Sequence, residues 1–179
     1  AHMSAPETFL AFLAGKTTRL EIGHGVVCLP PAMNHPVKVA ERLQDGQILK
    51  FGGTRITVHL HPGHTRGSAS YSIPVTEGGR TYQVLIANIG TINPGVKLVG
   101  NKKYPEIAGD YARTFENQKA LPCDIFLSSH ASQYGLHRKY TPGAPYDPAR
   151  FVDPAGYQRA VASAEAAYRK QLAEERATH

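Results

Sequence analysis

Apolar and polar residues alternate from residue 56 to residue 60, which is the period of a half-buried β-strand. Pro62 and Gly63 come next, and both residue types favour a turn. The pattern therefore predicts a strand that ends at His64. A side chain held at the end of a rigid element is often functional, so His64 is the first candidate residue.

Five further strands are predicted from short runs that are apolar or alternate between apolar and polar residues. They cover residues 41–43, 48–50, 70–74, 83–87 and 125–127. The pairs Asp45-Gly46 and Gly78-Gly79 are turn signals, and they join the first two and the next two of these strands into hairpins. Gly52-Gly53 provides a turn between the first hairpin and the strand before His64.

Three helices are predicted, at residues 4–13, 104–119 and 155–175. Ser4 and Glu7 form a capping box at the start of the first helix. The other two helices carry apolar residues at spacings of three and four, which is typical of a helix with one buried face. The segments 88–101 and 141–154 contain Pro and Gly and are predicted to be irregular.

Composition narrows the partners but does not identify a function. The 179 residues carry a formal net charge of +6, which could attract an anionic partner. Lys and Arg are scattered, however, and no basic run with interleaved aromatic residues occurs, so we expect a solvated basic surface and no nucleic acid. No apolar run approaches the roughly 18 residues that span a membrane, so no membrane contact is expected. His2 and Pro6 interrupt any start that resembles a signal peptide.

Histidines carry most of the candidate chemistry in this chain. A neutral imidazole is a good zinc ligand, and His59, His61 and His64 fall within six residues. Each of the three, taken alone, is also compatible with a surface or structural role. His130 comes just after an apolar strand, as His64 does, whereas His137 lies beside basic residues and is expected at the surface. Zinc binding at strand ends is the chemistry that this placement favours.

The stretch from His61 to Ser68, His-Pro-Gly-His-Thr-Arg-Gly-Ser, resembles a motif of the metallo-β-lactamase superfamily. In that motif, Pro-Gly-His-(Thr/Ser)-x-Gly-(Ser/Cys), the histidine after Pro-Gly binds zinc. Three later stretches, at residues 101–105, 110–115 and 120–124, resemble the C-terminal part of subclass B3 metallo-β-lactamases. Ser128-Ser129-His130 then stands where that family has its last zinc histidine.

The resemblance implies an α/β fold, namely the C-terminal portion of the αβ/βα sandwich, with a mixed sheet and flanking helices. Subclass B3 enzymes carry a His-x-His-x-Asp-His cluster upstream of Pro-Gly-His, and this sequence contains none. We therefore interpret residues 1–179 as a single metallo-β-lactamase-type domain that is incomplete at its N-terminus. Some relatives form a disulfide from the position of Cys123 to a later cysteine, which this sequence lacks, so Cys28 and Cys123 are expected to be free and buried.

The resemblance also implies the site residues. His64 and His130 would each bind one of two zinc ions, and no protein nucleophile is needed. The 88–101 loop borders the zinc site in the family, which makes Thr91 and Asn93 candidates for substrate binding, while a plain loop role stays open for this segment. Ile89 stands where relatives usually have serine, so a polar contact is absent there.

The activity implied is hydrolysis of β-lactam antibiotics by a metal-bound hydroxide, in the periplasm or outside the cell. A catalytic zinc normally has about three protein ligands, so this chain alone is expected to be inactive and to bind zinc weakly or not at all. It would need the missing N-terminal segment or a second protomer as its partner. Two alternatives stay open: another hydrolase of the same fold, of thioesterase or lactonase type, and a non-catalytic remnant that acts only by association.

Overall fold

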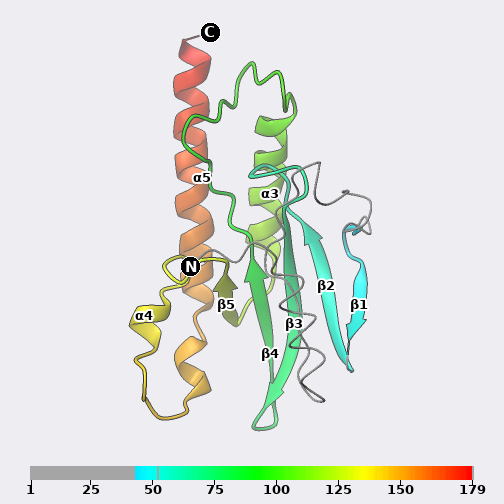
Figure 1. Ribbon diagram of the computed structural model, residues 1–179, viewed down its shortest axis with the longest axis vertical. Helices are drawn as coiled ribbons and strands as arrows, with labels where there is room; N and C mark the ends of the chain where they lie inside the picture. Colours follow the sequence, from blue (N-terminus) through cyan, green and yellow to red (C-terminus); the bar gives the residue numbers. More distant parts are fainter. Residues whose placement is uncertain (1–42, 52, 179) are drawn as a thin grey trace, which may run out of the picture. The chain divides into compact units, whose positions relative to one another are not determined.

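The computed structural model describes residues 43–51 and 53–178, all within one compact unit that spans Leu43–His179. The predicted helix at 4–13, Cys28 and most of the predicted strand at 41–43 lie outside these residues. Figure 1 shows two long helices running side by side next to a mixed sheet. This arrangement confirms the predicted sheet with flanking helices, and the single domain over residues 1–179 stays a prediction.

The sheet has five strands in the order β1-β2-β3-β4-β5, which is also their order along the chain. The strands are β1 (Ile48–Phe51), β2 (Thr54–Leu60), β3 (Ala69–Glu77), β4 (Arg80–Ala87) and β5 (Ile125–Ser128). The first three pairings are antiparallel, and the pairing of β4 with β5 is parallel. β3 and β4 are longer than predicted because their ladder continues to the pair of Glu77 and Arg80 at the tight turn.

Two further strand predictions differ from the structure. β2 stops at Leu60, four residues before His64. The amide of His61 still donates to the Ser68 carbonyl at 2.8 Å, but Pro62 has no amide hydrogen with which to continue the ladder. Leu43 is not part of a strand, and β1 pairs with β2 instead.

The helices are α3 (Ile107–Ala120), a short α4 (Leu136–Lys139) and α5 (Pro154–Ala177), with a 3-10 turn, η1, at Pro148–Phe151. α3 begins three residues later than predicted, since Tyr104 precedes Pro105 and a residue before proline disfavours the helical conformation. The Asp153 carboxylate caps α5 by accepting the Gly156 amide at 2.8 Å. None of the helices in the described part of the chain is long and apolar enough to cross a membrane.

The core lies between the sheet and the paired helices α3 and α5 (Figure 1). Tyr111 and Phe115 of α3 pack on Tyr168 of α5, and the centroids of the three rings lie between 5.5 and 6.0 Å apart. Phe126 of β5 packs on Tyr157 of α5 at 5.4 Å. The predicted helix stripes are confirmed, because the buried residues of the two helices include Ile107, Tyr111, Phe115, Gln118, Tyr157, Val161 and Tyr168.

The opposite side of the sheet is also apolar. Successive residues of a strand point to opposite faces, and Leu85, Ala87 and Phe126 belong to the core under the helices. The alternate residues of β3, β4 and β5 form what we call the outer face: Tyr71, Ile73, Val75, Tyr82, Val84, Ile86, Ile125 and Leu127. Val75 and Ile86 on this face are 42% and 39% exposed. The sheet therefore has two apolar faces, which is the pattern of a layer within a sandwich.

Candidate metal centre

The topology brings His64 and His130 to one edge of the sheet. β2, β4 and β5 run in the same direction, so their C-terminal ends meet at the same edge. His64 follows β2, the 88–101 loop follows β4, and His130 stands two residues after β5. β2 and β5 are three strand positions apart, or about 14 Å between strand axes, so loops must bridge the space between the two histidines.

The hydrogen bond of His64 favours one tautomer of its neutral ring. Its Nδ1 atom lies 2.7 Å from the backbone carbonyl oxygen of Thr91. A carbonyl oxygen can only accept, so Nδ1 carries the hydrogen and Nε2 of the neutral ring keeps its lone pair. A metal-binding histidine typically donates its second N–H to a carbonyl or carboxylate in this way. The geometry therefore favours His64 as a ligand through Nε2.

The turn before His64 is fixed by two residues of α3. The Thr114 hydroxyl donates to the Pro62 carbonyl at 2.6 Å. Gly63 has a φ of +137°, and a Cβ atom at this position would lie 2.8 Å from the Tyr111 ring. Only glycine fits both the backbone angle and the ring, which gives a physical reason for the Gly in the Pro-Gly-His sequence.

The 88–101 loop is irregular, as predicted, and its residues divide between core and surface. Ile89 is only 5% exposed and packs in the core, so an apolar side chain suits that position. The side chains of Thr91 and Asn93 are exposed. The Thr91 backbone, rather than its hydroxyl, reaches His64, and substrate binding by Thr91 and Asn93 stays a prediction.

His130 lies on an exposed turn beyond β5. Its carbonyl accepts the Gln133 amide at 3.0 Å, and the Ser128 hydroxyl donates to the Ala87 carbonyl of β4 at 2.8 Å. Within residues 43–51 and 53–178, no group of three or more His, Cys, Asp or Glu side chains could hold a metal ion. His64 and His130 therefore do not form a complete zinc site by themselves.

His59 and His61 have structural partners. His61 is 2% exposed, and a 2.7 Å hydrogen bond joins its Nδ1 to the Ser70 hydroxyl. His59 forms the equivalent 2.7 Å bond with Ser72 through Nε2. Burial, with a smaller effect of the neighbouring His59, lowers the pKa of His61 to about 4, and burial also lowers the pKa of His59. The lowered pKa values favour the neutral ring of both histidines at neutral pH, with His61 buried and His59 half-buried.

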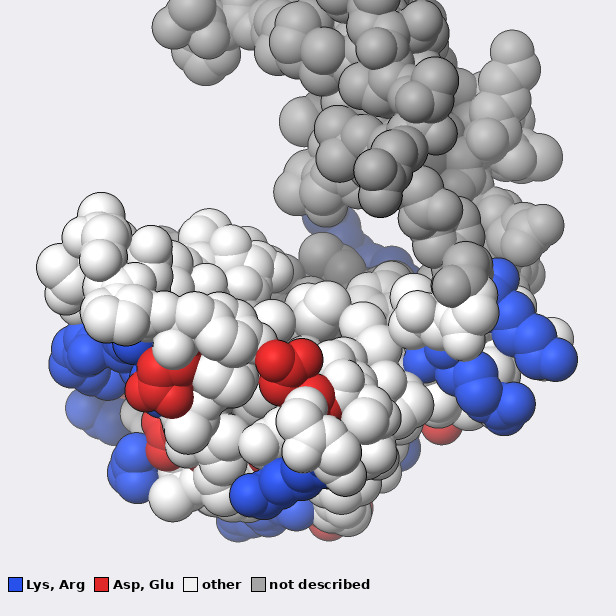
Figure 2. Space-filling model, turned by 90° about the horizontal axis from the view of Figure 1, so that it is seen from below, with Lys and Arg blue, Asp and Glu red and all other residues white. Residues whose placement is uncertain are grey.

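Basic side chains stand at several separate places around the described unit (Figure 2), in keeping with their scatter along the sequence. Three basic side chains line one cleft beside His64. This cleft has a volume of about 530 Å³, and Lys97, Lys102 and Lys103 line it together with His64 and Asn101. Its positive charge favours an anionic ligand next to the candidate metal ligand.

Cys123 is free and half-buried. Burial, followed by the nearby carboxylates of Asp124 and Asp153, raises the pKa of the Cys123 thiol to about 12. The thiol is therefore neutral at physiological pH, which makes it a poor nucleophile and a poor metal ligand.

Comparison with known proteins places these observations in a family. No family model matches the chain. Among solved structures, a β-lactamase from Chitinophaga pinensis is 45% identical, with a TM-score of 0.71 over 74% of this chain. The class B3 di-zinc metallo-β-lactamase LRA-12 from an Alaskan soil metagenome is 40% identical, with a TM-score of 0.70 over 74% of this chain. The metallo-β-lactamase GOB-18 from Elizabethkingia meningoseptica is 38% identical, with a TM-score of 0.70 over 74% of this chain.

The mixed sheet, its helices and the Pro-Gly-His turn at the sheet edge together define a metallo-β-lactamase fold. Within that fold, the chain belongs to the subclass B3 metallo-β-lactamases. It spans about half of their length, since the match covers 51%, 51% and 49% of the Chitinophaga, LRA-12 and GOB-18 chains.

Some residues around His64 gave no functional signal in the sequence. Tyr111 belongs to the 110–115 stretch that resembles subclass B3 enzymes and to the apolar stripe of the predicted helix at 104–119, and neither assigned it a role at the site. Its hydroxyl donates to the Thr91 carbonyl at 2.8 Å. Lys97, Lys102 and Lys103 were part of a scattered basic surface until the fold brought them to one cleft. The one sequence signal for such a cleft was that Lys102 and Lys103 are adjacent and directly follow the 88–101 loop.

Proposed function

We propose that this chain is one half of a zinc-dependent β-lactam hydrolase and that it supplies His64 and His130 to a two-zinc centre. The observation that carries the proposal is the hydrogen bond from His64 Nδ1 to the Thr91 carbonyl, which leaves Nε2 available to a metal ion. The 45% identity to a β-lactamase and the 40% identity to a di-zinc class B3 enzyme support the same reading. The proposed location is the periplasm or the outside of the cell.

The donors present fit part of such a centre. Imidazole nitrogen suits zinc, and His64 and His130 follow the ends of β2 and β5 by four and two residues. A catalytic zinc normally has three protein ligands, and no metal-holding group of three exists in the described part of the chain. The sequence has no His-x-His-x-Asp-His cluster, so we infer that the remaining ligands come from polypeptide outside these 179 residues.

Bound zinc would supply a water of lowered pKa as nucleophile and would polarise the substrate carbonyl. In this proposal, the residues of this chain hold the zinc ligands and the substrate in position. In the neutral ring of His64 the hydrogen lies on Nδ1, which leaves the Nε2 lone pair for a metal ion, and His130 follows β5 by two residues. The lysine cleft beside His64 suits the carboxylate of a β-lactam, and the exposed Thr91 and Asn93 are the proposed substrate contacts of the loop.

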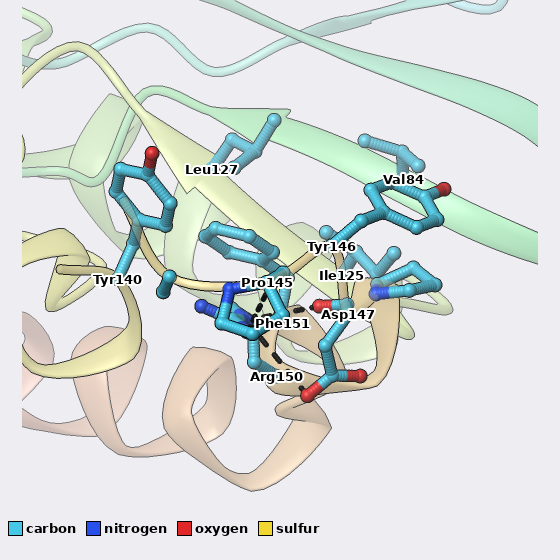
Figure 3. A pocket seen from close by; sticks show the side chains of 11 residues that line it. Val84, Ile125, Leu127, Tyr140, Pro145, Tyr146, Asp147, Arg150 and Phe151 are labelled. Atoms are coloured by element: carbon cyan, nitrogen blue, oxygen red, sulfur yellow. Dashed lines mark hydrogen bonds and ion pairs between the residues drawn. The ribbon is translucent and has the colours of Figure 1, made fainter. Parts of the chain in front are cut away.

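The outer face supports the need for a partner. An apolar cavity of about 560 Å³ lies on it, and Figure 3 shows Val84, Ile125 and Leu127 of the sheet facing aromatic side chains of the 140–151 segment. Tyr146 at this cavity is 79% exposed. Contiguous exposed apolar surface usually marks an interaction site. We propose that the covering partner is the N-terminal segment or a second protomer, which would also deliver the missing zinc ligands.

Complementation tests this function. The chain is mixed with the half of the Chitinophaga pinensis β-lactamase that it does not cover, and zinc content and nitrocefin hydrolysis are measured. We expect no hydrolysis by the chain alone and zinc-dependent hydrolysis by the pair. His64→Ala or His130→Ala should lower kcat/KM of the pair by about 100-fold or more, since each removes a zinc ligand. His137→Ala, at an exposed histidine of α4, is the matched control and should have no effect.

Other outcomes separate the alternatives. Hydrolysis of a thioester or a lactone without hydrolysis of nitrocefin would replace the β-lactamase proposal with a related hydrolase. A pair that assembles but binds no zinc would identify a non-catalytic remnant. Unchanged turnover in both histidine variants would remove His64 and His130 from the site.

A further inference from the structure

Tyr111 of α3 contacts the turn that carries His64 in two ways. Its ring lies against Gly63, so closely that a Cβ atom there would come within 2.8 Å of a ring carbon. Its hydroxyl donates to the Thr91 carbonyl at 2.8 Å. That same oxygen accepts the His64 Nδ1 hydrogen at 2.7 Å. One tyrosine therefore supports both the backbone before His64 and the acceptor of its ring.

The Thr91 carbonyl has two lone pairs, and these two donors use both. With both sites filled, the direction of the carbonyl is fixed, and a fixed acceptor selects the ring nitrogen that carries the hydrogen. Tyr111 can act as such a brace because it is itself immobile. It is 1% exposed, and its ring packs on Phe115 at 6.0 Å and on Tyr168 at 5.7 Å.

The hydroxyl of Tyr111 stays a donor throughout the useful pH range. Burial raises the pKa of Tyr111 to about 12. Packing alone does not require this hydroxyl, because Phe115, one turn further along α3, fills the same core with an unsubstituted ring. The hydroxyl thus has one visible function, which is its bond to the Thr91 carbonyl.

We propose that Tyr111 is a positioning residue for the zinc ligand His64: by holding the Thr91 carbonyl, it keeps His64 in the Nδ1–H tautomer and presents Nε2 to the metal. Presentation to zinc rests on the proposed function, whereas the effect on the tautomer does not. The Tyr111 hydroxyl bonds to the Thr91 carbonyl, so its proposed effect on the metal ligand passes through Thr91 and His64.

The tautomer is measured directly in the metal-free chain of 179 residues. Long-range ¹H–¹⁵N NMR distinguishes protonated from unprotonated ring nitrogens of histidine, at pH 8, above the usual histidine pKa of about 6.5. We expect His64 of the wild-type chain to show a protonated Nδ1. In Tyr111→Phe, which keeps the ring and removes only the hydroxyl, the ratio of Nε2–H to Nδ1–H forms should rise at least threefold.

Tyr157→Phe is the matched control. Tyr157 is also fully buried, and its hydroxyl donates to a backbone carbonyl, that of Gln118, at 2.7 Å, but it does not reach Thr91. This variant should leave the His64 tautomer unchanged. The proposal is wrong if Tyr111→Phe leaves the tautomer unchanged, if Tyr157→Phe shifts it equally, or if Tyr111→Phe alone unfolds the chain by far-UV circular dichroism.

Zinc affinity of the complemented pair provides the second readout. Loss of an outer partner of a zinc histidine typically costs 10- to 100-fold in metal affinity, so Tyr111→Phe should weaken zinc binding by about tenfold or more. Tyr157→Phe should leave it unchanged. If the wild-type pair binds no zinc, the proposed function fails, while a tautomer shift in the free chain would still establish the positioning role.

Discussion

At the residue scale, the partner of each histidine decides its role. His59 and His61 pair with serine hydroxyls of the neighbouring strand β3, and the Gln118 amide nitrogen lies 3.4 Å from His61 Nδ1. His64 instead donates to a carbonyl of a different loop, and among the described residues no hydrogen bond involves its other nitrogen. Three histidines within six residues therefore separate into two structural residues and one candidate ligand.

Acid is expected to destabilise the chain through His61. Burial holds the folded pKa of His61 at about 4, below the unfolded value of about 6.5. As pH falls, the unfolded state binds the proton first, so this contribution to stability is complete above pH 6.5. It is lost between pH 6.5 and pH 4, by about 3 kcal/mol in total. Urea unfolding at pH 7.5 and pH 4.5 measures the loss.

The His61→Asn variant should lose most of this extra acid sensitivity, because it keeps a polar side chain without a titrating ring. The exposed His137→Asn variant should retain it. An equal pH dependence in the wild type and His61→Asn would show that other groups cause the destabilisation.

At the element scale, α5 holds the far end of the loop whose beginning is held by α3. The Glu175 carboxylate accepts the amides of Leu98 and Val99 at 2.7 and 2.8 Å. Gln171, one turn earlier, donates to the Val96 carbonyl at 2.8 Å. In Figure 1 the loop passes close to the C-terminal part of α5 before it enters α3. The loop that borders the candidate site is therefore fixed at both ends by helices.

Removing the Glu175 carboxylate should loosen this loop. Glu175→Ala leaves the Leu98 and Val99 amides without their charged acceptor, which we expect to cost about 1–3 kcal/mol of stability. Hydrogen exchange of these two amides should become at least about tenfold faster, since about 1.4 kcal/mol corresponds to a factor of ten. Thermal unfolding and amide exchange measure the two effects.

Glu174→Ala is the control for this prediction. Glu174 is its exposed neighbour, and its ion pair with Lys170 is long, at 4.0 Å. Such a surface pair contributes little, so stability and exchange at Leu98 and Val99 should not change. Equal effects of the two variants would mean that α5 does not anchor the loop through Glu175.

At the scale of the whole molecule, the sheet is a layer with two apolar faces. One face packs on α3 and α5, and the outer face presents rows of aliphatic and aromatic side chains from three strands. A chain that spans about half of its relatives and exposes such a face has the surface expected of an inner layer. Assembly and zinc binding are therefore coupled in the proposed enzyme.

Ile86→Asp should prevent association with the complementing half and leave the unit itself folded. Ile86 is 39% exposed on the outer face, so a carboxylate there stays hydrated in the free chain but would lose its water in the complex. Size-exclusion chromatography of the mixed halves, together with nitrocefin turnover, measures association. Both signals should fall by about tenfold or more.

Thr81→Asp is the matched control on the same strand. Thr81 is exposed and belongs to the alternate row of β4, not to the outer face. It should associate as the wild type does. Normal association of Ile86→Asp would place the partner on another surface of the molecule.

Patterns among residues close in the sequence predicted most of the described helices and strands. Where the bounds differ, residues adjacent in the sequence explain the difference. The turn at Gly78-Gly79 and the stripe of α3 depend on residues within a few positions, so their patterns were sufficient. The end of β2 and the start of α3 moved by three or four residues, because Pro62 ends a ladder and Pro105 restricts Tyr104. The segment 141–154 was predicted to be irregular, but it contains the short turn η1. The Asp147 side chain caps this turn by accepting the Ala149 amide.

The sequence by itself determined the class of fold and the two candidate ligands. Strand alternation, the Pro-Gly turn and the apolar run at 125–127 place His64 and His130 after strands, and these signals act between neighbours in the chain. Only the tertiary structure decided which nitrogen of His64 is free, because its partner Thr91 lies 27 residues away and Tyr111 a further 20 residues on. Hydrogen bonds between such distant residues form only when the sheet and α3 have packed, and no local pattern encodes them.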